Sequence, residues 1–489
     1  MNPPPATPVS LSLAAVDQPG LALYPEQSAR FILTLRNLGA SDVEALKLAG
    51  NNDYPVIFAL QPDGRLIGEY NKSSLQERAG LDPETKEPGR PKSVVLGPGK
   101  DDKRVFDLWT FTEGFAPGRY LVQAEHALVP LGVPLRSGSV GFEIVDANVD
   151  SSAAGFTWID QSQGVLAWLA TRRNPAGGPL RLLIRASAAK GMASLLNGAV
   201  AAGEFPTGST VAVSHAMRGP SRWARAWVAV ASLGSLWLVR HHFGTVVLTR
   251  EFKLPRMDRS TLVAGFPDLG RRALAMLAAS TGSRHVLAGF LGDESEPSLI
   301  TWEIGLAAAP SALAVVTGDD QSIVLVYVTD DGRKAELRRL RFSPEGKLLE
   351  GERVLRSTPH AVRAQSAVSI LDRRPGFAVL EVDRERPNLL SFVRVELDGT
   401  VKAFETHTPN GWPKRPLKQV DVGQDAQGVV YLAAVDVDGA VFAGRMDRGV
   451  SLKADGRQGQ FHHVHVVCHR AEASVCAFTT NGRLFISKL

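Results

Sequence analysis

The sequence predicts an all-β protein in which a series of repeated antiparallel sheets follows a separate N-terminal sandwich. After Val149 the 489-residue chain repeats one pattern seven times: a short apolar run, a polar turn, and a second run that often ends in charge. Before that point, strand patterns follow one another from Val9 onward. The clearest repeats are 323–341, 377–396, 429–447 and 475–489, and the weaker ones are 165–186, 225–242 and 273–291.

The spacing of the repeats predicts how the sheets are arranged. Successive copies begin roughly 45–60 residues apart, and such a period with strands throughout is typical of a radially repeated fold, the β-propeller. We expect up to four strands in each repeat and favour seven blades; six or eight stay open because the first interval is stretched. The last repeat ends after its third strand. Either residues near 148–152 supply the missing outer strand, or the seventh blade has three strands.

Hairpin turns support this assignment. Asp331-Gly332, Asp438-Gly439 and Asn481-Gly482 each fall between the second and third strands of a repeat, and Asp398-Gly399 falls between a third and a fourth. Tight hairpins need positive φ, which glycine adopts without steric cost. The acids at 436–438 and 319–320 fit the same turn chemistry, because neither set has the further ligands of a calcium loop.

The first part of the chain reads as a tail and a sandwich. Residues 1–8 are rich in proline and predict a flexible tail, while 9–146 predict about seven half-buried strands in two sheets. Phe31, Leu33 and Leu35 alternate with more polar neighbours, as one face of a strand requires. The strand candidates are 9–15, 29–37, 56–60, 93–96, 104–109, 118–125 and 139–145.

Two short elements in this part resemble the immunoglobulin-like sandwiches of bacterial proteins. They are 31–39 (FILTLRNLG), with an Asn-x-Gly element, and 115–122 (FAPGRYLV), with a Pro-Gly-x-Tyr element. The resemblance implies that the first turns the chain after an early strand. It implies that the second starts a late strand with a packed tyrosine, Tyr120.

The remaining organisation follows from composition. Small and polar residues at 147–155 predict a linker, so that 156–489 would form the propeller. The polar segment 68–92 is long for a loop, and either an interaction role or a solvated insertion would account for it.

Charge and cysteine content narrow the classes of partner and compartment. The chain has 55 Lys and Arg against 50 Asp and Glu, a net charge of +5 without a basic tract, so nucleic acid is not an expected partner. Arg338, Arg339 and Arg341 are expected at the solvated edge of a strand. The apolar stretch 223–239 predicts a buried hairpin and no membrane span. Two cysteines form no disulfide framework and indicate a reducing compartment, so we expect a cytoplasmic protein.

The C-terminal histidines are the densest group of metal-type ligands. His462, His463, His465, Cys468 and His469 lie together, but alternate residues of a strand point to opposite faces. His463 and His465 could hold a metal with a partner from the next blade. The favoured reading is an inner strand with hydrogen-bonded histidines, so no metal, cofactor or catalytic residue is predicted. Cys468 and Cys476 could face each other across a hairpin, although free thiols are favoured.

The favoured function is a non-enzymatic scaffold that presents a propeller face to another protein. Arg222, Trp223, Arg225 and Trp412 lie in loop-like contexts and are candidate partner-binding residues, with packing as the alternative. A carbohydrate-binding propeller stays open because 420–441 resembles, in outline, the hairpin of bacterial fucose-binding lectins. Those lectins place a sugar-stacking tryptophan after that hairpin, whereas this chain has Gly444, Arg445 and Met446. A hydrolase or lyase with its site at the channel mouth is the other alternative.

Overall fold

The computed structural model describes most of the chain, and every regular element in the described residues is a β-strand. None of these residues forms a helix that could cross a membrane. The chain divides into two compact units between Asp146 and Ala147. The described residues are 8–16, 21–23, 30–48, 55–70, 93–107, 116–128, 134–159, 162–173, 177–188, 200–206, 209–213, 225–232, 234–242, 245–253, 259–265, 274–281, 284–292, 297–302, 310–317, 320, 322–368, 376–386, 389–396, 400–403, 408–425, 427–454, 460–469, 472–480 and 484–489.

The N-terminal unit contains two main sheets and a two-stranded ribbon. The first sheet has the order β1-β3-β8, and the second has the order β2-β11-β9-β5-β6, with β10 also paired with β9. The ribbon is β4-β7. The strands are β1 (Val9–Ala15), β2 (Leu21–Leu23), β3 (Arg30–Asn37), β4 (Val43–Leu46), β5 (Val56–Leu60), β6 (Leu66–Tyr70), β7 (Ser93–Leu96), β8 (Asp101–Asp107), β9 (Gly118–Ala127), β10 (Pro134–Arg136) and β11 (Val140–Ile144).

The core of this unit lies where the alternation predicts it. Phe31, Leu33 and Leu35 of β3 are fully buried in one apolar cluster with residues of both main sheets. Strands β1, β5 and β7 have the predicted bounds. The short strands β2, β4, β6 and β10 were not predicted, because three to five residues show too little alternation to be recognised.

The two elements of the immunoglobulin-like resemblance both form ordered contacts. The buried Asn37 side chain donates to the Leu96 and Ser41 carbonyls at 2.7 and 2.8 Å and accepts from Gly39 N–H. Tyr120 stacks on Phe142 at 5.5 Å and donates its hydroxyl to the Ala116 carbonyl at 2.6 Å. These contacts fit the roles that the resemblance implies, while the assignment to an immunoglobulin-like class stays a prediction.

The described residues of the C-terminal unit form seven antiparallel sheets, here called blades one to seven in chain order. Blades one to six have four strands and blade seven has three, and within each blade the strands are ordered as in the sequence. The first strand of each blade is its inner strand. Blade one is β12 (Ala147–Ile159), β13 (Ser162–Arg173), β14 (Gly177–Ala188) and β15 (Val200–Phe205). Blade two is β16 (Thr210–Val213), β17 (Arg225–Ala231), β18 (Ser235–His242) and β19 (Thr245–Lys253).

The later blades keep this plan. Blade three is β20 (Arg259–Gly265), β21 (Leu274–Thr281), β22 (Arg284–Gly292) and β23 (Pro297–Trp302); blade four is β24 (Pro310–Thr317), β25 (Ile323–Asp330), β26 (Ala335–Phe342) and β27 (Leu348–Thr358). Blade five is β28 (Ala361–Val368), β29 (Gly376–Val382), β30 (Leu390–Glu396) and β31 (Val401–Ala403); blade six is β32 (Leu417–Gln424), β33 (Val430–Asp436), β34 (Val441–Arg445) and β35 (Gly449–Ala454). Blade seven is β36 (Phe461–His469), β37 (Glu472–Thr479) and β38 (Leu484–Lys488).

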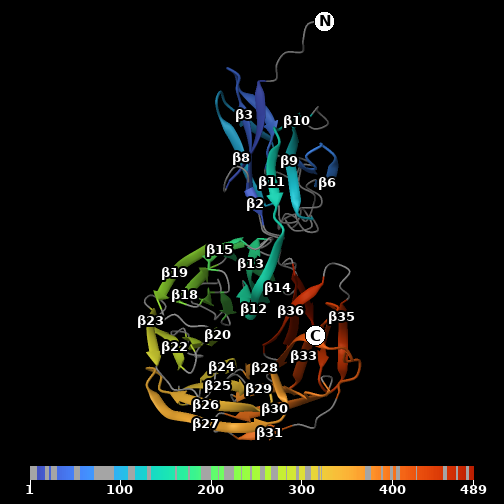
Figure 1. The fold of residues 1–489 in the computed structure, drawn as a ribbon. Coiled ribbons are helices and arrows are strands. Elements are labelled where there is room, and N and C mark those ends of the chain that lie inside the picture. The colour runs from blue at the N-terminus through green and yellow to red at the C-terminus, as the bar shows by residue number, and fades with distance from the viewer. Residues whose placement is uncertain are drawn as a thin grey trace. The chain divides into compact units, whose positions relative to one another are not determined.

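The inner strands close the blades into a ring. Each inner strand contacts the inner strand of the next blade, and β36 of blade seven contacts β12 of blade one (Figure 1). Consecutive sheets that meet around a closed ring make a β-propeller. Apolar clusters fill the space between neighbouring blades: one joins Val326 and Leu337 of blade four to Phe377 and Val379 of blade five.

The start of the ring differs from the prediction. Residues 147–155, expected as a linker, belong to β12, which is the inner strand of blade one. The nearby residues 148–152 therefore supply no outer strand to blade seven. The ring closes by contact between the inner strands β36 and β12. In addition, Val149 N–H of β12 donates to the carbonyl of Thr480, which follows β37, at 2.9 Å. The small and polar residues at 147–155 show too little apolar alternation for a strand to be recognised from the sequence.

Polar side chains on one inner strand accept hydrogen bonds from the backbone N–H groups of the inner strand in the next blade. Asp421 Oδ2 and Gln419 Oε1 of β32 accept from Val466 N–H and Val464 N–H of β36, at 2.7 and 3.0 Å. Ser151 Oγ of β12 accepts from Val211 N–H of β16 at 3.1 Å. Inside a ring these N–H groups would otherwise lack acceptors, at a cost of about 1–3 kcal/mol each. The side chains therefore hold neighbouring blades together.

The turn predictions hold wherever the turns are described. Gly332 and Gly439 have φ of 86° and 80°, and Asp436 Oδ1 accepts from Asp438 N–H and Ala440 N–H. Asn481-Gly482 and Asp398-Gly399 lie outside the described residues. Neither Cys468 nor Cys476 forms a disulfide bond. Cys468 lies opposite Ala473, and Cys476 lies opposite His465, so the hairpin does not bring the two thiols face to face.

Asp421 makes the ring sensitive to pH. Burial raises its pKa to about 7, against the opposing effect of its backbone hydrogen bonds. An acid whose pKa is raised in the folded state contributes fully to the unfolding free energy below its ordinary pKa of 3.8. That contribution to stability is lost as pH rises through 7. We expect Asp421→Asn to flatten this part of the decline in unfolding free energy between pH 4 and 7, measured by urea unfolding at each pH. An unchanged slope would contradict the assignment.

Candidate functional site

The outer strands of blade four carry the richest set of described charged contacts. Along β26, Ala335 and Leu337 pack into the cluster with blade five, while Glu336 and Arg338 lie on the other face of the strand. This follows from strand geometry, because successive side chains point to opposite faces. The segment 334–341, KAELRRLR, alternates charged and apolar residues in just this way until Arg339.

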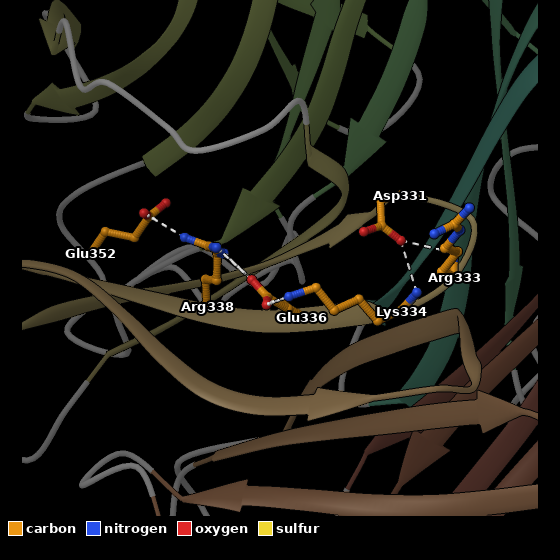
Figure 2. A network of polar contacts seen from close by, with 6 residues as sticks. All are labelled: Asp331, Arg333, Lys334, Glu336, Arg338 and Glu352. Carbon is orange, nitrogen blue, oxygen red and sulfur yellow. Dashed lines mark hydrogen bonds and ion pairs between the residues drawn. The ribbon is translucent and has the colours of Figure 1, made fainter.

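One face carries a continuous chain of ion pairs (Figure 2). Lys334 Nζ lies 2.6 Å from Glu336 Oε1, Arg338 Nη2 lies 2.5 Å from Glu336 Oε2, and Arg338 Nη1 lies 2.6 Å from Glu352 Oε2 on β27. The Lys334 and Arg338 hydrogen bonds lower the pKa of Glu336, and the Glu336 hydrogen bond raises that of Lys334. Glu336 and Arg338 are largely covered while Lys334 is exposed. We call these four residues the charged ladder.

The turn beside the ladder is ordered by its aspartates. Asp331 Oδ1 accepts from Arg333 N–H and Lys334 N–H, both at 2.8 Å, and these bonds, with Lys334 the larger, lower the pKa of Asp331. Asp330 Oδ1 accepts from Gly332 N–H at 2.8 Å. The backbone that leads into the ladder is therefore held in one conformation.

The opposite face of the same strands carries a second set of pairs. Arg341 Nη1 lies 2.8 Å from Glu350 Oε1, and Arg341 also pairs with Asp320. Arg339 pairs with Glu350. The Arg341 hydrogen bond is the main cause of the lowered pKa of Glu350. Both faces of β26 thus hold their arginines in fixed positions.

The expectation that these arginines line a solvated strand edge is wrong. Strand β26 is the third strand and is covered by β27, and Arg339 is only 5% exposed. The sequence shows the charges but not the carboxylates on the neighbouring strand that make their burial possible. Arg338 finds Glu352, and Arg341 finds Glu350, only because the hairpin pairs β26 with β27.

Blade four is tied to blade five by a buried carboxylate. Glu381 of β29, 1% exposed, accepts from Arg356 Nε and Nη2 at 2.6 and 3.0 Å and from Thr358 Oγ1 at 3.1 Å. Nearby, Arg384 Nη2 lies 2.7 Å from Asp330 Oδ1, and its Nε donates to the Pro359 carbonyl at 2.9 Å. Sequence reasoning missed these groups; the one signal was an acid, Glu381, inside an otherwise apolar strand.

Exposed aliphatic side chains accompany the charges on β27. Leu348, Leu349 and Val354 are 39%, 52% and 46% exposed. Among the residues of the C-terminal unit whose side-chain exposure the structure describes, the only other exposed large aliphatic residue is Val437. Strand β27 is also the outer strand of its sheet. These exposed aliphatic side chains lie on the same strand as Glu350 and Glu352, the partners of Arg341 and Arg338.

Of the four predicted partner-binding residues, the structure describes Arg225 and Trp412. Arg222 and Trp223 lie outside the described residues, and Arg225 begins β17 opposite His242. Trp412 is 5% exposed and packs with Phe392 and Val420 between blades five and six. Its ring therefore has the packing role that was the alternative, and it is not a surface anchor. The segment 68–92, for which an interaction role and a solvated insertion were the two alternatives, is outside the described residues beyond Tyr70.

The C-terminal histidines line the inner strand of blade seven, as favoured from sequence. His465 Nε2 lies 2.8 Å from Ser152 Oγ of β12, so this pair joins blade seven to blade one. Burial lowers the pKa of His465 to about 3 and, with the charge of His462, that of His463 to about 4. Within the described part of the chain, no three His, Cys, Asp or Glu side chains form a metal-type group.

The similarity of this chain to known proteins is low. No known protein family matches it, and no curated protein matches it either. The chain is similar to BBS1N, solved in complex with ARL6DN, at a TM-score of 0.40 and 12% identity over 66% of this chain and 88% of that one. It is similar to the Aleuria aurantia lectin, a six-bladed β-propeller, at a TM-score of 0.38 and 11% identity over 62% of this chain and 95% of that one. It is also similar to a subtype N10 neuraminidase-like protein of A/little yellow-shouldered bat/Guatemala/060/2010, at a TM-score of 0.39 and 9% identity over 56% of this chain and 92% of that one. Similarity this low carries no argument about function.

The buried Glu381 carboxylate should contribute more to the unfolding free energy than an exposed ion pair does. Glu381→Ala leaves Arg356 and Thr358 without their acceptor, so we expect the unfolding free energy to fall by about 2–4 kcal/mol. The matched control is Asp447→Ala, which breaks the exposed Arg445–Asp447 pair and should cost less than about 1 kcal/mol. Equal losses in the two variants, measured by urea unfolding, would show that Glu381 does not join the blades.

Acid should weaken the contact between blades seven and one. A histidine whose pKa is lowered in the folded state makes the protein less stable as pH falls below the ordinary histidine pKa of 6.5. For His465 this loss continues toward its folded-state pKa of about 3. We expect His465→Gln to reduce the fall in Tm between pH 6.5 and 4, although His463 retains part of it. The same fall in Tm in the variant and the unaltered chain would rule out His465 as the titrating group.

Proposed function

We propose that this chain is a non-enzymatic scaffold that binds a partner protein on the outer strand of blade four. The observation that carries the proposal is the concentration of exposed Leu348, Leu349 and Val354 on β27, beside the charged ladder. Exposed aliphatic side chains rimmed by polar groups are typical of protein interaction surfaces.

The charges favour a protein partner because they are already held in place. Arg338 is fixed by Glu336 and Glu352, so its side chain loses little conformational freedom when a partner binds. Arginine is also enriched among the residues that dominate binding energy at protein interfaces. Lys334 is exposed at the end of the ladder, so it can exchange its bond to Glu336 for an acidic group of the partner while the Arg338 contacts stay intact.

The rigidity of the blade supports a scaffold role. Strand β27 is joined to blade five through Arg356 and Glu381, and the turn at Asp330 is joined to it through Arg384. Because β27 pairs within blade four and is also bonded to blade five, it presents one conformation to a partner. A cytoplasmic location, which the cysteine content predicts, belongs to the same proposal.

The test compares two surface variants. Leu349→Lys with Val354→Lys should remove a specific set of proteins captured from extracts of the source organism and reduce their recovery at least tenfold. Val437→Lys, an equally exposed aliphatic site in blade six, is the matched control and should leave recovery within twofold. Both changes are at exposed positions and should alter unfolding free energy by less than about 1 kcal/mol.

Capture that is equally strong with both variants would place the binding surface elsewhere. Capture that is lost in both would indicate a general change in surface charge and would also contradict the proposal. A folded chain that retains no protein in any form would remove the support for a scaffold.

A further inference from the structure

Among the residues that the structure describes, blade seven has three strands where every other blade has four. Blades one to six each pair a fourth strand with the third, whereas the described sheet of blade seven ends at β38. The other blades therefore show what would lie against this edge: a strand antiparallel to β38.

Blade six gives the closest template for β38 through its register. Strand β34 pairs with β33 from Val441↔Val435 to Arg445↔Tyr431, and β38 pairs with β37 from Leu484↔Phe478 to Lys488↔Ser474. Five consecutive positions thus correspond. They equate Leu484 with Val441, Phe485 with Phe442, Ile486 with Ala443, Ser487 with Gly444 and Lys488 with Arg445.

The burial of the two strands differs as a missing cover predicts. In β34 the first four residues are buried, while in β38 the first four are only half-buried and Lys488 is exposed. Phe485 makes an edge contact with Phe461 at 5.9 Å but keeps exposed surface. Aliphatic and aromatic residues on a sheet edge that retain exposed surface favour strand addition.

The backbone of β38 is oriented to accept a strand. Leu489 N–H donates to the Ala473 carbonyl of β37 at 2.9 Å. Since N–H direction alternates along a strand, the N–H groups of Ile486 and Lys488 point away from β37. These are the groups that a fourth strand would pair with.

The template also specifies side-chain chemistry. In blade six, Ala454 lies opposite Val441, Lys453 opposite Phe442 and Leu452 opposite Ala443. Lys453 Nζ lies 5.6 Å from the centre of the Phe442 ring, a cation–π contact. The equivalent ring in blade seven is Phe485, so a basic residue in the incoming strand would lie over it.

We propose that the edge of β38 binds an extended segment of a partner protein, antiparallel to β38, with an apolar–basic–apolar pattern. The basic residue lies over Phe485, and backbone hydrogen bonds to Ile486 and Lys488 supply the rest. This is strand addition to a sheet edge, a recurring mode of peptide recognition. The site is separate from β27 and does not depend on the function proposed there.

The probe is a fluorescent peptide that copies Gly449–Ala454, GVSLKA, titrated against the full chain by anisotropy. We expect saturable binding with a Kd on the order of 100 μM, since the interface is a single short strand. Ile486→Pro removes an outward N–H and should weaken binding at least tenfold. Ile486→Val, the matched control, keeps the N–H and should stay within twofold.

Because proline could unfold blade seven, a second arm changes only the peptide. GVSPKA loses one backbone donor and GVSLEA reverses the basic residue, and each should bind at least fivefold more weakly. Absence of binding by GVSLKA, or equal binding of all three peptides, would overturn the proposal. Concentration-dependent dimerisation that Ile486→Pro abolishes would instead identify a second copy of this chain as the occupant and would also overturn it.

Discussion

The ring of inner strands is the constraint on which the rest of the C-terminal unit depends. An inner strand pairs with only one neighbour in its own sheet, so its other edge carries N–H groups that no sheet satisfies. Asp421, Gln419 and Ser151 supply the acceptors from the adjacent blade. The spacing between blades is therefore set by hydrogen bonds as well as by apolar packing, and the apolar clusters between blades fill the space that these bonds define.

Farther from the centre, charged pairs take over from apolar contacts. Blades diverge outward, so outer strands have fewer apolar neighbours, and long charged side chains can span the distance. Arg356 reaches Glu381 in this way, and Arg338 reaches Glu352 within its own blade. The same arrangement leaves β27 with aliphatic side chains that no blade covers. A surface suited to binding is thus a consequence of how a radial fold is stabilised at its rim.

Much of the fold could be predicted, and the errors have physical reasons. The repeats and the Asp-Gly turns at Gly332 and Gly439 are local features, set by alternation and by the φ that a hairpin needs. The loop-like context of Trp412 left both partner binding and packing open, and the chain folds its ring between two blades. The immunoglobulin-like class of the first unit and the roles of Arg222, Trp223 and Arg225 stay predictions.

The sequence alone is enough to establish that the chain is all-β, where most strands and turns fall, and that the second part repeats one sheet. These follow from local periodicity, which needs no knowledge of distant contacts. Three-dimensional contacts are needed to establish that β12 is an inner strand, that Arg339 is buried and that blade seven has an edge without a described fourth strand. Each depends on which residue lies opposite or beside another across a sheet or between blades. A single sequence carries no signal of such pairings, because the partners are far apart in the chain.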